Sequence, residues 1–282
     1  MQLLELPVKY ASADLDWKPI HIMPIGDVQL GAAGCDTDRL KRHIEWGMKQ
    51  PDTYFIGMGD YVDVASPSNR RLLRAAHLYD SVYEALEEAA TRAEEQYLGL
   101  VKGTEGRWLG LLEGHHYYEH ADGTTSDTRI ALGLGAPFLG DAAFLRLRFV
   151  RGEHSTIPAT IWLHHGQGSG RGAGAPLAAL ERIVSHFDAD IYLMGHMHKL
   201  VGAPIDQLYM SRTGRLKHRT KMIACTGSFL RGYAQDSTAA GRAQGGYVEK
   251  AMLPPVALGG IVLTLTPIHE AEDDRLDIRI SL

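Results

Sequence analysis

The sequence predicts an α/β fold, and two features of the chain indicate this class. Short apolar runs of strand length alternate with segments of helical spacing along the first two-thirds of the 282 residues. In addition, clusters of Asp, Gln and His come directly after several of these apolar runs. Because open α/β sheets bind ligands at the carboxyl ends of their strands, the clusters predict a functional site there.

The chain opens with a β-α-β unit. Residues 19–25 and residues 53–58 are apolar runs of strand length. Between them, residues 38–48 place apolar side chains four residues apart, as one face of a helix requires.

Residues 67–103 predict a helical insertion, either one long amphipathic helix or a helical pair. Apolar positions recur there at intervals of three and four residues. We interpret the stripe of Tyr79, Tyr83 and Tyr97 as core that covers a sheet rather than as a cofactor site.

The β-α alternation continues beyond the insertion. Further strands are predicted at residues 108–112, 144–150, 160–163 and 191–194, and further helices after a Thr125 cap and at residues 176–187. A β-rich C-terminal part is predicted at residues 205–282, with a hairpin around Thr213-Gly214 and strands at 261–265 and 276–280.

Composition excludes several classes of protein. A chain that is 45% apolar and 22% charged is typical of a globular protein, and residues 1–282 are expected to form a single domain. A net charge of -5 disfavours wrapping of duplex nucleic acid by bulk electrostatics. Cys35 and Cys225 are too few for a disulfide framework, and no apolar run reaches membrane-spanning length. We therefore expect a soluble, cytoplasmic protein with no membrane partner.

Five polar clusters carry the chemistry. Mixed carboxylate and imidazole ligands suit borderline divalent ions better than the all-oxygen shells of Mg²⁺ and Ca²⁺. Two such ions about 3.5–4 Å apart can clamp the attacking and leaving oxygens of an in-line displacement at phosphorus. The clusters, in chain order, are Asp27-Val28-Gln29, Gly59-Asp60-Tyr61-Val62-Asp63, Gly114-His115-His116, His164-His165 and Gly195-His196-Met197-His198.

This order of motifs resembles that of the calcineurin-like metallophosphoesterases, which carry D-x-H, G-D-x-x-D, G-N-H, a later His and G-H-x-H. The resemblance implies a four-layer α/β/β/α sandwich of two mixed β-sheets flanked by helices. It also implies that Asp27, Asp60 and His198 hold a first metal ion, with Gln29 at the position of the family's histidine.

The same resemblance implies a second metal ion that shares Asp60 and takes three histidines. These are His115, His164 and His196. His164 is favoured because in several relatives one residue separates the ligand from the following Gly or Pro, and His165 is the alternative.

The last residue of the family's G-N-H motif lies near the leaving group. His116 is therefore expected to act as a general acid or transition-state stabiliser, and Asp63 is expected to orient it.

Two positions depart from the family pattern. Gln29 offers a neutral amide oxygen where the family has an imidazole, and His115 offers an imidazole where the family has an amide. Relatives with D-x-Q include manganese-dependent ADP-ribose and CDP-alcohol diphosphatases, so Mn²⁺ is the favoured ion, with Fe, Ni, Co and Zn as alternatives. The change at His115 alters how far the ligand atom of the second metal site lies from the backbone.

The resemblance implies an enzyme, a dinuclear metal-dependent phosphoric ester hydrolase that works by in-line attack of a metal-bridging hydroxide. Phosphodiester or phosphoanhydride substrates are expected, because Val64-Ala65 replaces the Arg-Gly that follows G-D-x-x-D in serine/threonine phosphatases. The expected partner is a phosphorylated small molecule or nucleotide. A rival class is a binding scaffold, similar to the retromer subunit that has this fold without its catalytic residues.

Two further segments invite other interpretations. The glycine-rich stretch at residues 166–174 is interpreted as a rim of the metal site, with Arg171 near substrate phosphate, rather than as a dinucleotide cradle. The predicted hairpin carries a basic cluster that is either a solvated face or the rim of a nucleic-acid site in a DNA exonuclease. The cluster comprises Arg212, Arg215, Lys217, His218, Arg219 and Lys221.

Overall fold

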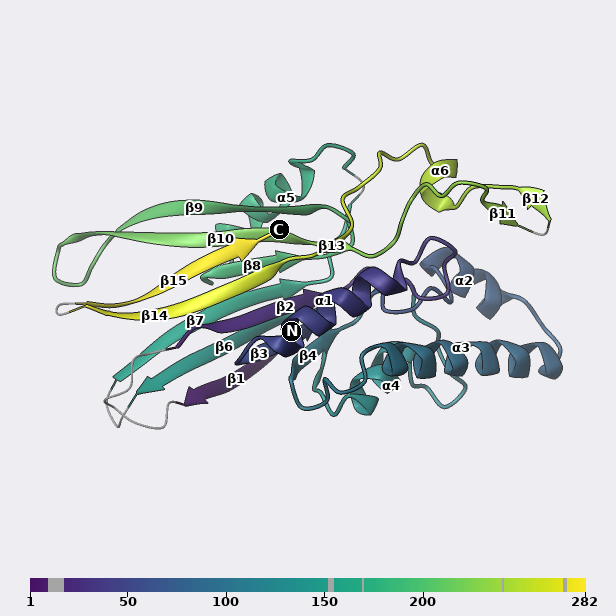
Figure 1. Ribbon diagram of the computed structural model, residues 1–282, viewed down its shortest axis with the longest axis horizontal. Coiled ribbons are helices and arrows are strands. Elements are labelled where there is room, and N and C mark those ends of the chain that lie inside the picture. The colour runs from purple at the N-terminus through teal and green to yellow at the C-terminus, as the bar shows by residue number, and fades with distance from the viewer. Residues whose placement is uncertain (10–17, 152–154, 169, 240, 271–272) are drawn as a thin grey trace.

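Two mixed β-sheets lie face to face at the centre of the computed structural model, with helices on both outer sides (Figure 1). The structure describes residues 1–9, 18–151, 155–168, 170–239, 241–270 and 273–282. The arrangement is the four-layer α/β/β/α sandwich that the motif order implied.

The first sheet has six strands in the order β15-β14-β2-β3-β4-β5. Its central strands are parallel, so their carboxyl ends meet at one edge, and they confirm the predicted β-α-β opening. The bounds are β2 (Ile20–Ile25), β3 (Thr53–Gly57), β4 (Trp108–Leu112), β5 (Phe138–Gly140), β14 (Val262–Glu270) and β15 (Asp273–Ser281).

The second sheet has seven strands in the order β1-β6-β7-β8-β10-β13, with β9 also paired to β10. Strands β7, β8 and β10 are parallel, and β9 and β10 form the predicted hairpin with longer arms than the sequence indicated. The bounds are β1 (Gln2–Lys9), β6 (Ala142–Arg151), β7 (Ser155–His164), β8 (Ile191–Met194), β9 (Leu200–Met210), β10 (Leu216–Ser228) and β13 (Gly259–Gly260).

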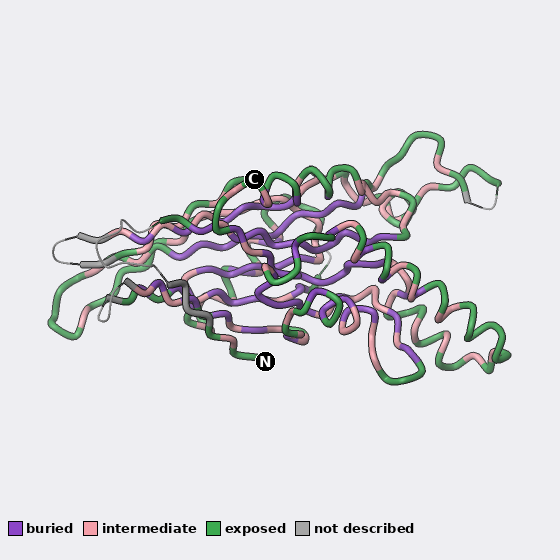
Figure 2. Tube along the Cα trace, turned by 60° about the horizontal axis from the view of Figure 1, so that its bottom comes forward, coloured by how far each residue is buried: buried purple, intermediate pink, exposed green. Residues whose placement is uncertain are grey.

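The main core lies between the two sheets, and Figure 2 shows it as the buried central stretch of the strands. Strand β8 illustrates how the sequence divides between layers, because alternate side chains of a strand point to opposite faces. Ile191 and Leu193 are buried between the sheets, whereas Tyr192 and Met194 are buried against the outer helix α5 (Ala175–Val184). An apolar run therefore forms this strand because both of its faces are covered.

Helices α1 (Thr37–Lys49), α3 (Asp80–Leu100) and α4 (Ser126–Gly133) cover the outer face of the six-stranded sheet. As predicted, Thr125 caps α4, and its side chain accepts a hydrogen bond from the backbone of Thr128. A short segment between β10 and β13 contains β11 (Thr238–Ala239), β12 (Arg242–Ala243) and α6 (Tyr247–Lys250). Among the described residues, no helix has the length and apolarity needed to span a membrane.

The predicted insertion is a pair of helices, α2 (Pro67–Ala75) and α3. Tyr97 is fully buried, as expected of core. The interpretation of Tyr79 and Tyr83 as core is wrong, because their side chains are 84% and 39% exposed. The N-terminal half of α3 extends past the edge of the sheet (Figure 1), so only its later turns meet the core.

Candidate metal centre

The polar clusters meet where strands of both sheets end. Asp27 follows β2, Asp60 follows β3, His115 follows β4, His165 follows β7 and His196 follows β8. Hydrogen bonds from backbone amides join the loops: the amide of Asp27 donates to the carbonyl of Gly59 (3.0 Å), and the amide of His196 donates to the side-chain Oδ2 of Asp27 (2.8 Å). The face-to-face packing of the sheets therefore brings loops from distant parts of the sequence together.

The backbone of the site is held in an uncommon conformation. Asp27, Gln29, Asp60, His196 and His198 have φ between 49° and 61°, in the left-handed region. They make up five of the eight non-glycine residues with positive φ in the described chain. Such residues cost free energy and persist where the surroundings over-determine them, which is a recurrent property of functional sites.

Two carboxylates lie at the bottom of the site, with Asp27 0% and Asp60 2% exposed. Asp60 Oδ1 accepts hydrogen bonds from the amides of His115 and His116, the second at 2.9 Å. Burial opposes ionisation of Asp60, but the imidazole of His165 and these neighbours hold its pKa well below the usual range. Asp27 Oδ1 is buried and has no hydrogen-bond partner among the residues that the structure describes, although His198 Nε2 lies 3.3 Å away.

Of the two adjacent histidines, the structure brings His165 into the cluster and leaves His164 outside it. His165 Nδ1 donates to the carbonyl of Met58 (2.6 Å). Its buried Nε2 lies 3.4 Å from Asp60 Oδ2 and has no hydrogen-bond partner within the described ranges. His164 Nδ1 instead accepts from the amide of Gly166 (2.7 Å), and its ring stacks on Trp162. Consecutive residues at a strand end point to opposite faces, so only one of the pair can face the carboxylates.

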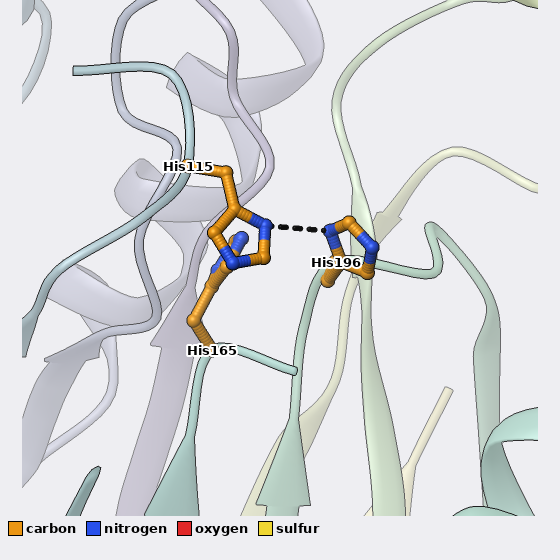
Figure 3. Close-up of side chains that lie close together, drawn as sticks. All are labelled: His115, His165 and His196. Carbon is orange, nitrogen blue, oxygen red and sulfur yellow. Dashed lines mark hydrogen bonds between the residues drawn. The ribbon is translucent and has the colours of Figure 1, made fainter. Parts of the chain in front are cut away.

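His115, His165 and His196 converge from three loops (Figure 3). The Nδ1 atoms of His115 and His196 lie 3.1 Å apart, and His196 Nε2 donates to the carbonyl of Gly168 (3.0 Å). This hydrogen bond fixes the tautomer of His196 and leaves its Nδ1 lone pair facing His115. Burial and the two other imidazoles lower the pKa of His115 to about 4, so its ring is neutral and available as a ligand at neutral pH.

His198 and Gln29 border the other carboxylate. Gln29 Nε2 lies 3.3 Å from His198 Nε2, which is in turn 3.3 Å from Asp27 Oδ1. Gln29 is thus placed among the donors despite its departure from the family pattern. If the amide oxygen and nitrogen of Gln29 were exchanged, the oxygen would take the position of Nε2, beside His198 Nε2.

The donor atoms form two overlapping groups that fit divalent metal ions. One group comprises Asp27, Asp60 and His165, and the other His115, His165 and His196, with the ligand atoms of each group within 4.8 Å of one another. Burial opposes protonation of His165, but the carboxylates of Asp60 and Asp27 raise its pKa to about 9. Asp27 Oδ1 and His165 Nε2 have no hydrogen-bond partner among the described residues, and a metal ion that replaced the Nε2 proton of His165 would satisfy both atoms.

His116 and Asp63 form a pair beside these donors. His116 Nδ1 donates to Asp63 Oδ1 at 2.7 Å. Burial opposes protonation of His116, but the hydrogen bond to Asp63 and the charge of Asp60 raise its pKa above the ordinary value. Asp63 therefore orients the imidazole and leaves Nε2 as the nitrogen available for proton transfer.

The glycine-rich loop borders the cluster, as its interpretation as a rim required. Gly168 supplies the carbonyl that holds His196, and Gly166 and Gly168 have φ of 114° and 112°, which favour glycine. Arg171 is exposed, and its Nη2 lies 3.5 Å from the carbonyl of Ala251. Ser169 lies outside the described residues.

The basic cluster of the hairpin is partly neutralised and lies away from the donors. Arg219 pairs with Asp188 and Asp190, and the buried Lys221 pairs with Asp188. Leu216 is nine residues before Cys225, which pairs with Met194 at the start of the histidine loop. The hairpin tip is therefore roughly 30 Å from that strand end.

Sequence reasoning missed two residues that hold the loop after β4. Asp127, fully buried at the start of α4, accepts from the amide of Gly114 (2.8 Å), and burial raises the pKa of its carboxyl to about 7. Arg70 of α2 donates to two carbonyls of the same loop. Neither residue belongs to a short motif, and only the three-dimensional structure brings them to the loop.

No protein-family model matches the sequence, and no curated protein matches it. Solved structures do match. Vps29 from Entamoeba histolytica, complexed with Zn²⁺, is 11% identical with a TM-score of 0.38, covering 93% of this chain and 99% of that chain. The NAD nucleotidase of Haemophilus influenzae is 8% identical with a TM-score of 0.41, covering 94% and 50%. A metallophosphoesterase from Sphaerobacter thermophilus is 12% identical with a TM-score of 0.30, covering 77% and 80%.

Proposed function

We propose that this chain is a phosphoesterase that uses two divalent metal ions, with Mn²⁺ favoured, to hydrolyse phosphodiester or phosphoanhydride bonds of a phosphorylated small molecule or nucleotide. The observation that carries the proposal is the pair of overlapping donor groups, which share His165 and include two buried carboxylates. Burial of two carboxylates side by side is costly unless positive charge compensates them.

Each side chain has a role in this proposal. Asp27, Gln29, Asp60 and His198 would hold one ion, and Asp60 with His115, His165 and His196 would hold the other. Bound ions would supply Lewis acidity toward the phosphoryl oxygens and lower the pKa of bound water. His116, fixed at Nδ1 by Asp63, would deliver a proton from Nε2 to the leaving oxygen.

The adjacent histidines provide a matched test. Apo protein is reconstituted with Mn²⁺, Ni²⁺, Zn²⁺ or Mg²⁺ and assayed with bis-p-nitrophenyl phosphate and p-nitrophenyl phosphate. We expect metal-dependent turnover, faster on the diester, that His165→Ala abolishes and His164→Ala largely retains. His116→Ala should lower kcat by about 10²–10⁴-fold, the usual contribution of a general acid.

Other outcomes would change the assignment. Loss of turnover in His164→Ala with retention in His165→Ala would contradict the ligand set. Binding of two ions without turnover on any surrogate would instead favour a metal-binding scaffold of the same fold.

A further inference from the structure

We propose that Arg70 is a positioning residue, through which the helical insertion sets the loop that carries His115 and His116. The inference rests on the proposed metal site, because it concerns the loop that would supply a ligand of the second ion. Arg70 lies on α2 and is distant in sequence from that loop.

The guanidinium of Arg70 reaches three backbone carbonyls. Its Nη1 lies 2.7 Å from the carbonyl oxygen of Ala65, 2.6 Å from that of His115 and 3.2 Å from that of Tyr117. Its Cζ lies 3.7 Å from the centre of the Tyr117 ring, and its side chain is only 12% exposed. These are charge-assisted contacts in a half-buried place, where they are stronger than contacts in water.

Hydrogen bonds hold both the amides and the carbonyls of this loop. Its amides point inward: Gly114 donates to Asp127, and His115 and His116 donate to Asp60. Arg70 holds the carbonyls of His115 and Tyr117, and the carbonyl of His116 between them accepts from the amides of residues 64 (3.2 Å) and 65 (3.3 Å). Arg70 therefore fixes the two carbonyls of the loop that these backbone amides do not reach.

Apolar packing does not explain the position of helix α2. None of its nine residues is buried, so it adds nothing to the apolar core. It is tied to the loop by polar contacts, since Arg70 and Arg74 both approach the carboxylate of Glu119. The neighbouring Arg71 is exposed and has no hydrogen bond or ion pair to any described residue, which makes it the matched control.

The first test uses metal-free full-length protein and needs no turnover. Hydrogen exchange is measured for Arg70→Met, Arg70→Lys and Arg71→Met. We expect the amides of residues 114–116 to exchange at least about tenfold faster in Arg70→Met, and at an intermediate rate in Arg70→Lys, because an ammonium can still donate to a carbonyl. Unchanged exchange in this loop, or equal acceleration in Arg71→Met, would overturn the proposal.

The second test titrates Mn²⁺ into the same variants by calorimetry. We expect Arg70→Met to weaken the binding event of the ion that would take His115 by about 10–100-fold, as loss of a supporting contact does at metal sites, and to weaken the other event, which shares only Asp60 with this loop, much less. Equal weakening of both events, or a lowered Tm with unchanged Kd values, would assign Arg70 a general structural role. If wild-type protein binds two ions without hydrolysing any ester, the proposed function fails, and these Kd values still decide the role of Arg70.

Discussion

Asp60 and His196 illustrate how backbone and side chain are selected together in this site. Both adopt left-handed φ, which Asp, Asn and His tolerate better than most residues because their short polar groups bond locally. An alanine at Asp60 would therefore combine backbone strain with loss of a ligand. Asp60→Asn keeps the shape and removes only the charge, so it is the cleaner probe of the carboxylate.

A half-buried histidine outside the candidate metal centre predicts how stability depends on pH. Desolvation lowers the pKa of His43 to about 4, and its Nε2 has no hydrogen-bond partner in the part of the chain that the structure describes. Since the folded pKa is below that of the unfolded chain, the unfolded state gains a proton first as the pH falls from about 6.5 toward 4. The contribution of His43 to the free energy of unfolding is fully present above that pH window. It is lost as the pH falls through the window, by about 2 kcal/mol at pH 5.

The measurement is urea unfolding of wild-type protein and His43→Leu at pH 7 and pH 5. Titration of other groups cancels when the pH-dependent loss of one protein is subtracted from that of the other. The loss should be about 2 kcal/mol smaller in His43→Leu. Equal losses in the two proteins would show that His43 is protonated in the folded state.

At the scale of elements, the cap of α4 has an effect beyond its own helix. Thr125 and Thr128 form a reciprocal capping box, and the first turn of α4 carries Asp127, which holds Gly114. Thr125→Ala should lower the free energy of unfolding by about 1 kcal/mol, whereas Thr125→Ser, which keeps the hydroxyl, should change it much less. Thermal unfolding of both variants checks this, and equal effects would argue against the cap.

Sequence patterns predicted some elements better than others, for physical reasons. Strands β4 and β8 have the predicted bounds because apolar residues fill both faces and polar loops end them. Strand β1 was missed, and its partner, β6, is more than 130 residues away. Strand β13 consists of two glycines, which carry no strand preference of their own.

At the scale of the whole molecule, the interface between the two sheets should dominate stability. Leu193 is fully buried in it, and Leu193→Ala should cost about 2–5 kcal/mol through lost burial and a residual cavity. Leu208 belongs to the same sheet and is 57% exposed, so Leu208→Ala should change stability by less than about 0.5 kcal/mol. Chemical denaturation of the two variants measures the contrast, and comparable losses would refute this account of the core.

The site could be predicted from sequence as a set of clusters but not as a geometry. Motif order identified the loops because each cluster follows a strand, and strand ends of both sheets meet. It favoured His164, whereas the structure places His165 beside Asp60, since a shift of one residue at a strand end reverses the direction of the side chain. The support from Arg70 and Asp127 depends on long-range packing, which no local pattern contains.

The β9–β10 hairpin and the helical insertion stand at opposite ends of the long axis (Figure 1). The exposed turn at Thr213-Gly214 therefore offers a handle for attaching the protein to a solid support or a sensor surface. Immobilised by an inserted tag at that turn, the molecule would present the end that carries the helical insertion to the solution, free of steric hindrance from the surface.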